Sequence, residues 1–172
     1  MMKSAPAWLA TLLLGAPASA LALNEGFETG TTAHHLVTVP TGGTAAVVSA
    51  FENYTPASGF RFLLLKTDGP GSYTTARQVH KLKAGDRLTG YAAFAARDYL
   101  PFNDNAQVRI RYGLTVVATP FAADVASTGT NVDGPWTPWS FTAPADGLYT
   151  VEYRIANEGD SGVDSYALFD AP

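Results

Sequence analysis

Apolar and polar side chains alternate strictly near the end of the chain, in the order Tyr149, Thr150, Val151, Glu152, Tyr153, Arg154 and Ile155. Successive side chains of a strand point to opposite faces, so this order predicts a strand with one buried face and one face in water. Residues 107–112 show the same alternation, with arginines on the polar side. If the two strands are neighbours, we expect Glu152 and Arg109 to form a cross-strand ion pair.

The rest of the chain contains short β-branched and apolar segments that are separated by glycine- and proline-rich turns. We expect about ten strands in these segments, which are 21–30, 33–39, 44–51, 60–65, 75–82, 87–96, 107–112, 114–118, 136–142, 149–155 and 165–169. No segment shows sustained helical periodicity, and no βαβ pattern is present. The sequence therefore predicts an all-β fold, an antiparallel β-sandwich of the jelly-roll, galactose-binding-like kind.

The end of the chain also predicts how its strands pair. A polar loop with Gly159 and Gly162 joins the alternating strand to the final segment 165–169, which favours a hairpin of the last two strands. The short apolar segment 60–65 is typical of a central strand that is buried on both faces. We expect one core that contains Val108, Ile110, Leu64, Val151, Tyr153 and Ile155.

The first 22 residues resemble a signal peptide rather than part of the fold. Lys3 supplies a positive charge, residues 7–14 are apolar, and small residues precede cleavage sites after Ala20 or Ala22. The apolar run is too short to span a bilayer, which takes about 20 residues. We therefore expect a secreted or periplasmic protein with no membrane span, in which residues 23–172 form one domain.

Charge and cysteine content exclude several classes of function. The formal net charge is −4 and the isoelectric point is near 5.2, so the sequence offers no basic footprint for nucleic acid or an anionic membrane. The chain contains no cysteine, which excludes disulfides, thiolate chemistry and zinc–thiolate sites.

Both ends of the expected domain resemble a known family. The opening motif NEGFETG at 24–30 and the closing motif SYALFD at 165–170 resemble those of secreted jelly-roll carbohydrate-binding modules. Residues 63–72, 82–86 and 98–104 resemble the same domain in bacterial exported proteins with cell-surface sorting tails. The resemblance implies a structural calcium that joins the first and last strands, with Glu28 and Asp170 among its ligands.

Carboxylates at loop positions are the side chains that calcium prefers, together with backbone carbonyls. Beside Glu28 and Asp170, we consider Glu25 and the region of Asp68 as further contributors to that site. Asp98 and Asp104 form a second candidate calcium site in the loop after residues 87–96. The alternative for this second pair is a structural one, in which the carboxylates cap a turn through Asx hydrogen bonds.

Three aromatic residues are candidates for ligand binding. Trp136 and Trp139 lie three apart on an expected strand, so they face opposite sides, and we expect one in the core and one more exposed. The exposed tryptophan together with Tyr73 or Tyr54 would form a stacking platform for a sugar ring. The alternative is that both tryptophans serve packing between the sheets.

The sequence offers no catalytic constellation, so we expect no enzyme. The motif GDSG at 159–162, together with His34, resembles motifs of serine proteases. However, Val163 and Asp164 occupy the positions after the serine at which an oxyanion hole needs glycines. We expect an exported, non-catalytic β-sandwich in extracellular binding, adhesion or matrix, with a polysaccharide or cell-surface component as partner. The alternatives are a carbohydrate-binding module and, from another class, a small secreted hydrolase.

Overall fold

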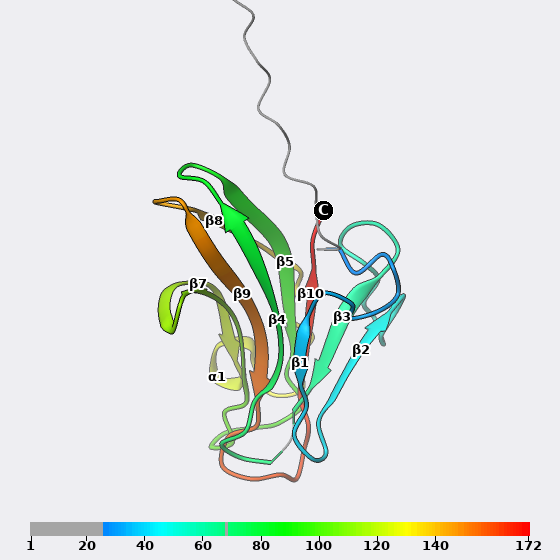
Figure 1. Ribbon diagram of the computed structural model, residues 1–172. Coiled ribbons are helices and arrows are strands. Elements are labelled where there is room, and N and C mark those ends of the chain that lie inside the picture. Colours follow the sequence, from blue (N-terminus) through cyan, green and yellow to red (C-terminus); the bar gives the residue numbers. More distant parts are fainter. Residues whose placement is uncertain (1–25, 68) are drawn as a thin grey trace, which may run out of the picture.

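The computed structural model describes residues 26–67 and 69–172, which form two five-stranded antiparallel sheets packed face to face (Figure 1). Sheet A has the order β1 (Leu36–Thr38), β4 (Thr74–Leu82), β9 (Gly147–Ala156), β6 (Asn105–Tyr112), β7 (Thr115–Asp124). Sheet B has the order β2 (Thr44–Val48), β3 (Phe62–Lys66), β10 (Tyr166–Asp170), β5 (Arg87–Ala95), β8 (Thr137–Thr142). The predicted antiparallel β-sandwich of about ten strands is confirmed.

Helix contributes almost nothing to the described residues. The one helix among them, α1 (Val125–Thr128), is a single turn that follows β7 and is capped by the side chain of Asp124. Within the part of the chain that the structure describes, no helix has the length and apolar character needed to cross a membrane. The expected signal peptide at 1–22, Glu25 and Asp68 lie outside the described residues.

The last two strands lie in different sheets. Strand β9 lies in the middle of sheet A between β4 and β6, whereas β10 lies in the middle of sheet B between β3 and β5. The predicted hairpin is therefore wrong. Strand β10 is apolar on both faces, with Phe169 in the sandwich core and Leu168 in a cluster on the outside of sheet B. Such a strand needs cover on both sides, and residues 157–165 are longer than a usual hairpin loop, so they cross from one sheet to the other.

The sandwich core confirms five of the six expected residues. Val108, Ile110, Val151, Tyr153 and Ile155 face inward from sheet A. Leu64 is the exception, because it lies with Phe62 on the outside of sheet B while Leu63 and Leu65 enter the core. Successive strand residues face opposite sides, so a continuous apolar run does not reveal which residues face the core. Strand β3 is nevertheless buried on both faces, as expected.

The outer face of sheet A is polar. Six of the side chains that line it lie together around Glu152, and we call them the arginine face: Arg77, Gln107, Arg109, Arg111, Glu152 and Arg154. Glu152 lies directly opposite Arg109 in the β6–β9 ladder, which confirms that these strands are neighbours. The expected ion pair between them is wrong, because Glu152 binds Arg77 at 2.7 Å and Arg111 at 3.2 Å. Arg109 instead donates from Nε to Gln107 at 2.7 Å.

Candidate functional site

The two tryptophans occupy different environments, as expected from their spacing. Trp139 is 5% exposed and lies in the sandwich core near Tyr153. Trp136 is half-buried on the outside of sheet B, where its ring meets Tyr54 and Phe62 edge-on at centroid distances of 6.1 and 5.6 Å. Its indole N–H donates to the Thr55 carbonyl at 2.9 Å. Trp136 is therefore the more exposed member of the pair.

Tyr73 lies on the opposite side of the molecule from Trp136. It immediately precedes β4 of sheet A, and the guanidinium of Arg154 lies 3.1 Å from the centroid of its ring. Since Arg154 belongs to the outer face of sheet A and Trp136 to the outer face of sheet B, the structure does not bring these two aromatic rings together. Of the two partners considered for the tryptophan, the structure brings Tyr54 to it, and Tyr54 is itself buried.

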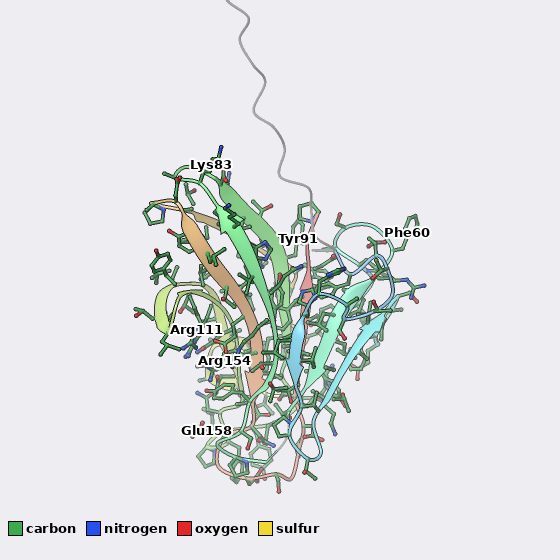
Figure 2. The ribbon with its side chains drawn as sticks, viewed as in Figure 1. Phe60, Lys83, Tyr91, Arg111, Arg154 and Glu158 are labelled. Carbon is green, nitrogen blue, oxygen red and sulfur yellow. The ribbon has the colours of Figure 1, made fainter. Side chains whose placement is uncertain are left out.

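The arginine face is built around one buried carboxylate. Glu152 is 1% exposed, and Arg77 and Arg111 each hold one of its oxygens from neighbouring strands. Burial raises the pKa of such a carboxyl, but the hydrogen bond and charge of Arg77 and the bond from Arg111 outweigh it, so the pKa of Glu152 is lowered. Arg154, which Figure 2 shows on the same side of the molecule as Arg111, and Arg109 of the neighbouring strand add positive charge on the same face.

Two grooves open on the surface of the described residues. One of about 230 Å³ lies on the arginine face and is lined by Arg77, Arg111, Gly113, Leu114 and Thr150. A second of about 410 Å³ lies where β7 and β8 form the edges of the two sheets, and its lining includes Phe121, Ser127, Thr128, Asp133, Pro135 and Thr137. The first groove combines guanidinium donors with an exposed leucine, whereas the second has Asp133 as its charged side chain.

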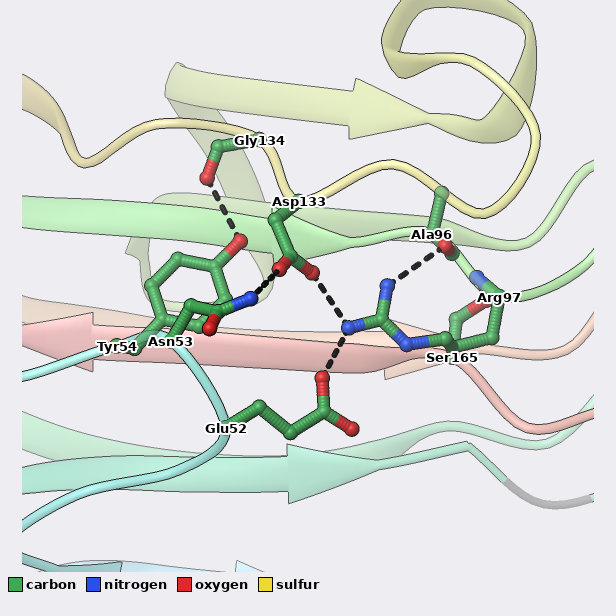
Figure 3. Close-up of polar contacts among 8 residues, drawn as sticks. All are labelled: Glu52, Asn53, Tyr54, Ala96, Arg97, Asp133, Gly134 and Ser165. Atoms are coloured by element: carbon green, nitrogen blue, oxygen red, sulfur yellow. Dashed lines mark hydrogen bonds and ion pairs between the residues drawn. The ribbon is translucent and has the colours of Figure 1, made fainter.

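Asp133 and its neighbours form a network that closes the sandwich beside the second groove (Figure 3). The guanidinium of Arg97 binds both Glu52 and Asp133, and Asn53 donates to Asp133 at 3.0 Å. The hydroxyl of Tyr54 donates to the Gly134 carbonyl at 2.7 Å, and burial raises the pKa of Tyr54 to about 12. These contacts tie the 51–54 turn and the loop before β8 to the end of β5. The positive charge of Arg97 is therefore balanced by the carboxylates of Glu52 and Asp133.

The first expected calcium pair converges on one loop. Both oxygens of Glu28 accept from the Phe60 amide at 3.0 and 3.1 Å, and Asp170 accepts from the Ser58 amide at 2.9 Å. Burial raises the pKa of Asp170, the amide hydrogen bonds oppose this, and the nearby charge of Glu28 adds to the rise. The structure thus brings Glu28 and Asp170 together, as the resemblance implied.

The second expected pair, Asp98 and Asp104, is buried at the opposite end of the sandwich. The two side chains are 1% and 0% exposed. One oxygen of each accepts a main-chain amide, from Tyr99 at 2.7 Å and from Glu158 at 3.1 Å, as the turn-capping alternative requires. The other oxygen of each is buried without a hydrogen bond among the described residues. Burial, with a smaller contribution from the charge of Asp98, raises the pKa of Asp104 to about 6.

Sequence analysis missed the residues that surround this second pair. Thr74, Asn157 and Ser165 are buried at the same end and are polar, and they lie two residues from the inward-facing Ala76, Ile155 and Ala167. Inward-facing positions recur every second residue along a strand. Counting two residues past the last apolar core residue of each strand would therefore have predicted these positions. Within residues 26–67 and 69–172, this place included, no three histidine, cysteine, aspartate or glutamate side chains gather as metal ligands.

Comparison with known proteins establishes the fold. No protein-family model and no curated protein matches the sequence. Among solved structures, TmCBM61 in complex with β-1,4-galactotriose matches with a TM-score of 0.54 and 16% identity, over 87% of this chain and 92% of that chain. The K1 cleaved adhesin domain of Lys-gingipain from Porphyromonas gingivalis W83 gives 0.53 and 15%, over 86% and 93%. A structure of promiscuous carbohydrate-binding modules of the β-sandwich superfamily gives 0.51 and 16%, over 85% of this chain and 58% of that chain. The chain therefore shares the β-sandwich fold of carbohydrate-binding modules and of an adhesin domain.

Proposed function

We propose that this chain is an exported, non-catalytic binding domain that holds an acidic polysaccharide or cell-surface glycan on the arginine face. The fold is one that carbohydrate-binding modules and an adhesin domain share. The observation that carries the proposal is the groove between Arg77 and Arg111, whose floor is Thr150 and whose rim is the 92% exposed Leu114. Concave sites of this kind combine apolar contact with a few fixed polar donors.

The charge of the arginine face favours an acidic ligand. Four arginines and one glutamate lie there, whereas the whole chain carries a formal charge of −4. Guanidinium groups present a planar fork of donors that matches a carboxylate or sulfate and also reaches sugar hydroxyls. Arg77 and Arg111 are held in place by Glu152, so their donors are ordered before a ligand arrives. Uronic or sulfated sugars are therefore the proposed ligand class.

Affinity electrophoresis on acidic and neutral polysaccharides tests this assignment. We expect retention on polyuronates or sulfated glycans, weakened by salt, and little retention on neutral galactan or xylan. Arg109→Gln removes one charge from the arginine face without touching the Glu152 ion pairs, so it should weaken retention about tenfold, the equivalent of one charge-assisted hydrogen bond. Lys83→Gln, on the exposed turn between β4 and β5, removes the same charge elsewhere and should leave retention unchanged (Figure 2).

Two further variants separate the alternatives. If Trp136→Ala abolishes retention while Arg109→Gln does not, the ligand binds the outer face of sheet B and the proposed surface is wrong. If no polysaccharide retains the wild-type chain, glycan binding fails altogether. Turnover in a hydrolase panel would point to the third class, a small secreted hydrolase.

We further propose that calcium links Glu28 to Asp170 and so ties the start of the described chain to its last strand. The donor set fits a hard cation, because the carboxylates of Glu28 and Asp170 meet on one loop. A Cβ added at Gly26 would lie 2.8 Å from the Ala171 carbonyl oxygen, so the first residues pass tightly over the end of β10. A calcium ion here would neutralise the two carboxylates and link the segment that contains Glu28 to the end of β10.

Thermal unfolding tests this tie. An ion that binds only the folded chain stabilises it by about 2.7 kcal/mol at a hundredfold excess over Kd, which raises the melting midpoint by roughly 5–10 °C. Glu28→Gln should remove that rise without changing retention on glycans, since Glu28 is remote from the arginine face. An unchanged rise in Glu28→Gln would rule out the proposed tie.

A further inference from the structure

One end of the sandwich core is closed by buried polar side chains. We call them the polar cage: Thr67, Thr74, Asp98, Asp104, Asn157 and Ser165, each 0% or 1% exposed. Each lies two residues beyond an inward-facing apolar residue of its strand, and these are Leu65, Ala76, Ala96, Ala106, Ile155 and Ala167. The cage therefore replaces the last apolar layer of the core.

Both sheets contribute to the cage, and several of its members are joined by hydrogen bonds. The β6–β9 ladder ends with Asn105 opposite Ala156, so Asp104 and Asn157 form the next pair, and both accept the Glu158 amide at 3.1 Å. In sheet B, the Thr67 amide donates to the Ser165 carbonyl at 3.1 Å, and the Ser165 amide donates to the Thr67 hydroxyl at 3.0 Å.

Asp104 connects the two halves of the cage. It lies close enough to Ser165 of sheet B for that residue to affect its pKa, and its charge interacts with that of Asp98. The cage therefore spans both sheets, and the two carboxylates lie within it.

Several atoms of the cage have no hydrogen-bond partner among the described residues. They are one oxygen each of Asp98 and Asp104, the hydroxyl of Thr74 and the side-chain amide nitrogen of Asn157. A buried polar group without a partner costs about 1–3 kcal/mol, and an ionised one costs more. Two carboxylates side by side add mutual repulsion. A cation between the two carboxylates would satisfy their free oxygens and remove the repulsion.

Nearby cationic side chains do not provide that charge. Arg97 adjoins Asp98, but its guanidinium binds Glu52 and Asp133. Lys66 adjoins Thr67, and its ammonium binds Asp164 at 2.7 Å. Glu158, beside Asn157, is acidic and has an exposed side chain, so it supplies no positive charge either. The two buried negative charges are thus left to a ligand.

We propose that the polar cage binds one calcium ion through the carboxylates of Asp98 and Asp104, with oxygens of Asn157 and Thr74 as further ligands. The available donors are oxygens, from two carboxylates, the Asn157 amide and the Thr74 hydroxyl. The hydroxyls of Thr67 and Ser165 already bind Asp164 and main-chain amides, and they complete the wall of the cage. Calcium takes six to eight such ligands in flexible geometry, whereas zinc prefers nitrogen and sulfur. An ion of charge +2 balances the two carboxylates. This site lies at the other end of the sandwich from Glu28 and Asp170 and does not depend on the proposed glycan binding.

The test compares melting midpoints in chelator and in millimolar calcium for the wild-type chain and for Asp104→Asn. The substitution keeps the shape of the side chain, removes one buried charge and adds an amide that can donate to Asp98. In chelator we expect the variant to melt above the wild type. In calcium we expect the order to reverse, because the variant loses the part of the rise that belongs to the cage, roughly 5–10 °C at a hundredfold excess over Kd.

Two controls assign the effect to the cage. Glu158→Gln removes the same charge from an exposed neighbour and should leave both midpoints unchanged. Metal analysis of dialysed protein should give one calcium per chain fewer in Asp104→Asn than in the wild type, and Asp98→Asn serves as the second variant if the first does not fold. In Glu28→Gln the calcium of the cage should remain, which separates the two sites.

The opposite results overturn the proposal. If Asp104→Asn and the wild type bind the same number of calcium ions, the cage is not a metal site. If the variant melts above the wild type in calcium as well as in chelator, the two carboxylates share a proton or are bridged by water instead.

Discussion

Glu152 and Asp104 are both buried carboxylates, but their surroundings shift their pKa values in opposite directions. Glu152, on the outer face of sheet A, is 1% exposed, and its pKa is lowered because Arg77 and Arg111 bind its oxygens. Asp104, at the end of the core, is 0% exposed, and burial raises its pKa to about 6. Burial penalises both charges alike, so the cationic partners decide the outcome.

The same difference separates the two proposed sites. On the arginine face the positive charges are part of the chain and outnumber the negative one, so the surface attracts anions. In the polar cage the negative charges are part of the chain and the balancing positive charge is not, so the site suits a cation. The proposals thus give opposite ligand classes to two places whose carboxylates look alike in the sequence.

Among the substitutions that test this comparison, Glu152→Gln should change the stability of the protein most. Removing one partner of a buried ion pair leaves Arg77 and Arg111 without a counter-charge, which costs about 3 kcal/mol. For a domain of this size the melting midpoint should fall by roughly 6–12 °C. Arg109→Gln, which leaves the ion pairs intact, is the matched control. Equal midpoints for the wild type and Glu152→Gln would show that the buried pair adds nothing.

The pH dependence of unfolding in chelator should reveal Asp104. Because its pKa rises from 3.8 unfolded to about 6 folded, the folded state binds the proton more tightly. The stability that Asp104 contributes is therefore fully present below pH 3.8 and is lost as the pH rises through about 6, by roughly 2–3 kcal/mol. Glu152 has the opposite sign, and its contribution is lost only as the pH falls below its unfolded value of 4.5.

Denaturant unfolding at several pH values measures this slope. In Asp104→Asn, the free energy of unfolding should depend less on pH in this range. The pH dependence that remains should be the smaller contribution of Asp170, whose pKa is also raised. A slope that is identical in the wild type and the variant would mean that Asp104 titrates normally.

Thr74→Val should have the smallest effect. The valine has nearly the shape of threonine and removes a buried hydroxyl that has no hydrogen bond among the described residues. In chelator we expect a change of about 1 kcal/mol or less, in the stabilising direction. In calcium the variant should bind the ion more weakly if the hydroxyl is a ligand, which isothermal titration calorimetry measures. A stabilisation that is the same in both conditions would place Thr74 outside the ligand set.

Local alternation carried most of the information about the sheets. The order of residues 149–155 and 107–112 predicted two strands with the observed inward faces, and only the structure shows that they are neighbours. The spacing of Trp136 and Trp139 predicted one core and one outer ring, although not which ring is which. These predictions succeed because a strand places successive side chains on opposite faces whatever its neighbours are.

Pairing across long distances was beyond the sequence. It did not show that β9 and β10 lie in different sheets, that Leu64 faces outward, or that Glu152 binds Arg77 rather than Arg109. It also did not distinguish Tyr73 from Tyr54 as the neighbour of Trp136. Each of these features depends on which strands are neighbours. The strand order is set by how the apolar surface of the whole domain is buried, which no single segment of the sequence shows.

The sequence by itself determined the β-sandwich and its polar and apolar faces, and it made Asp98 and Asp104 a candidate pair. Its resemblance to secreted jelly-roll modules implied the other pair, Glu28 with Asp170. Only the tertiary structure decided what surrounds each carboxylate. Glu28 accepts main-chain amides, Glu152 has arginines, and Asp98 and Asp104 lie in a buried cage without a cationic side chain among the described residues. The physical reason is that the charge of a carboxylate is a local property of the chain, whereas its solvation and its partners come from segments far apart in the sequence.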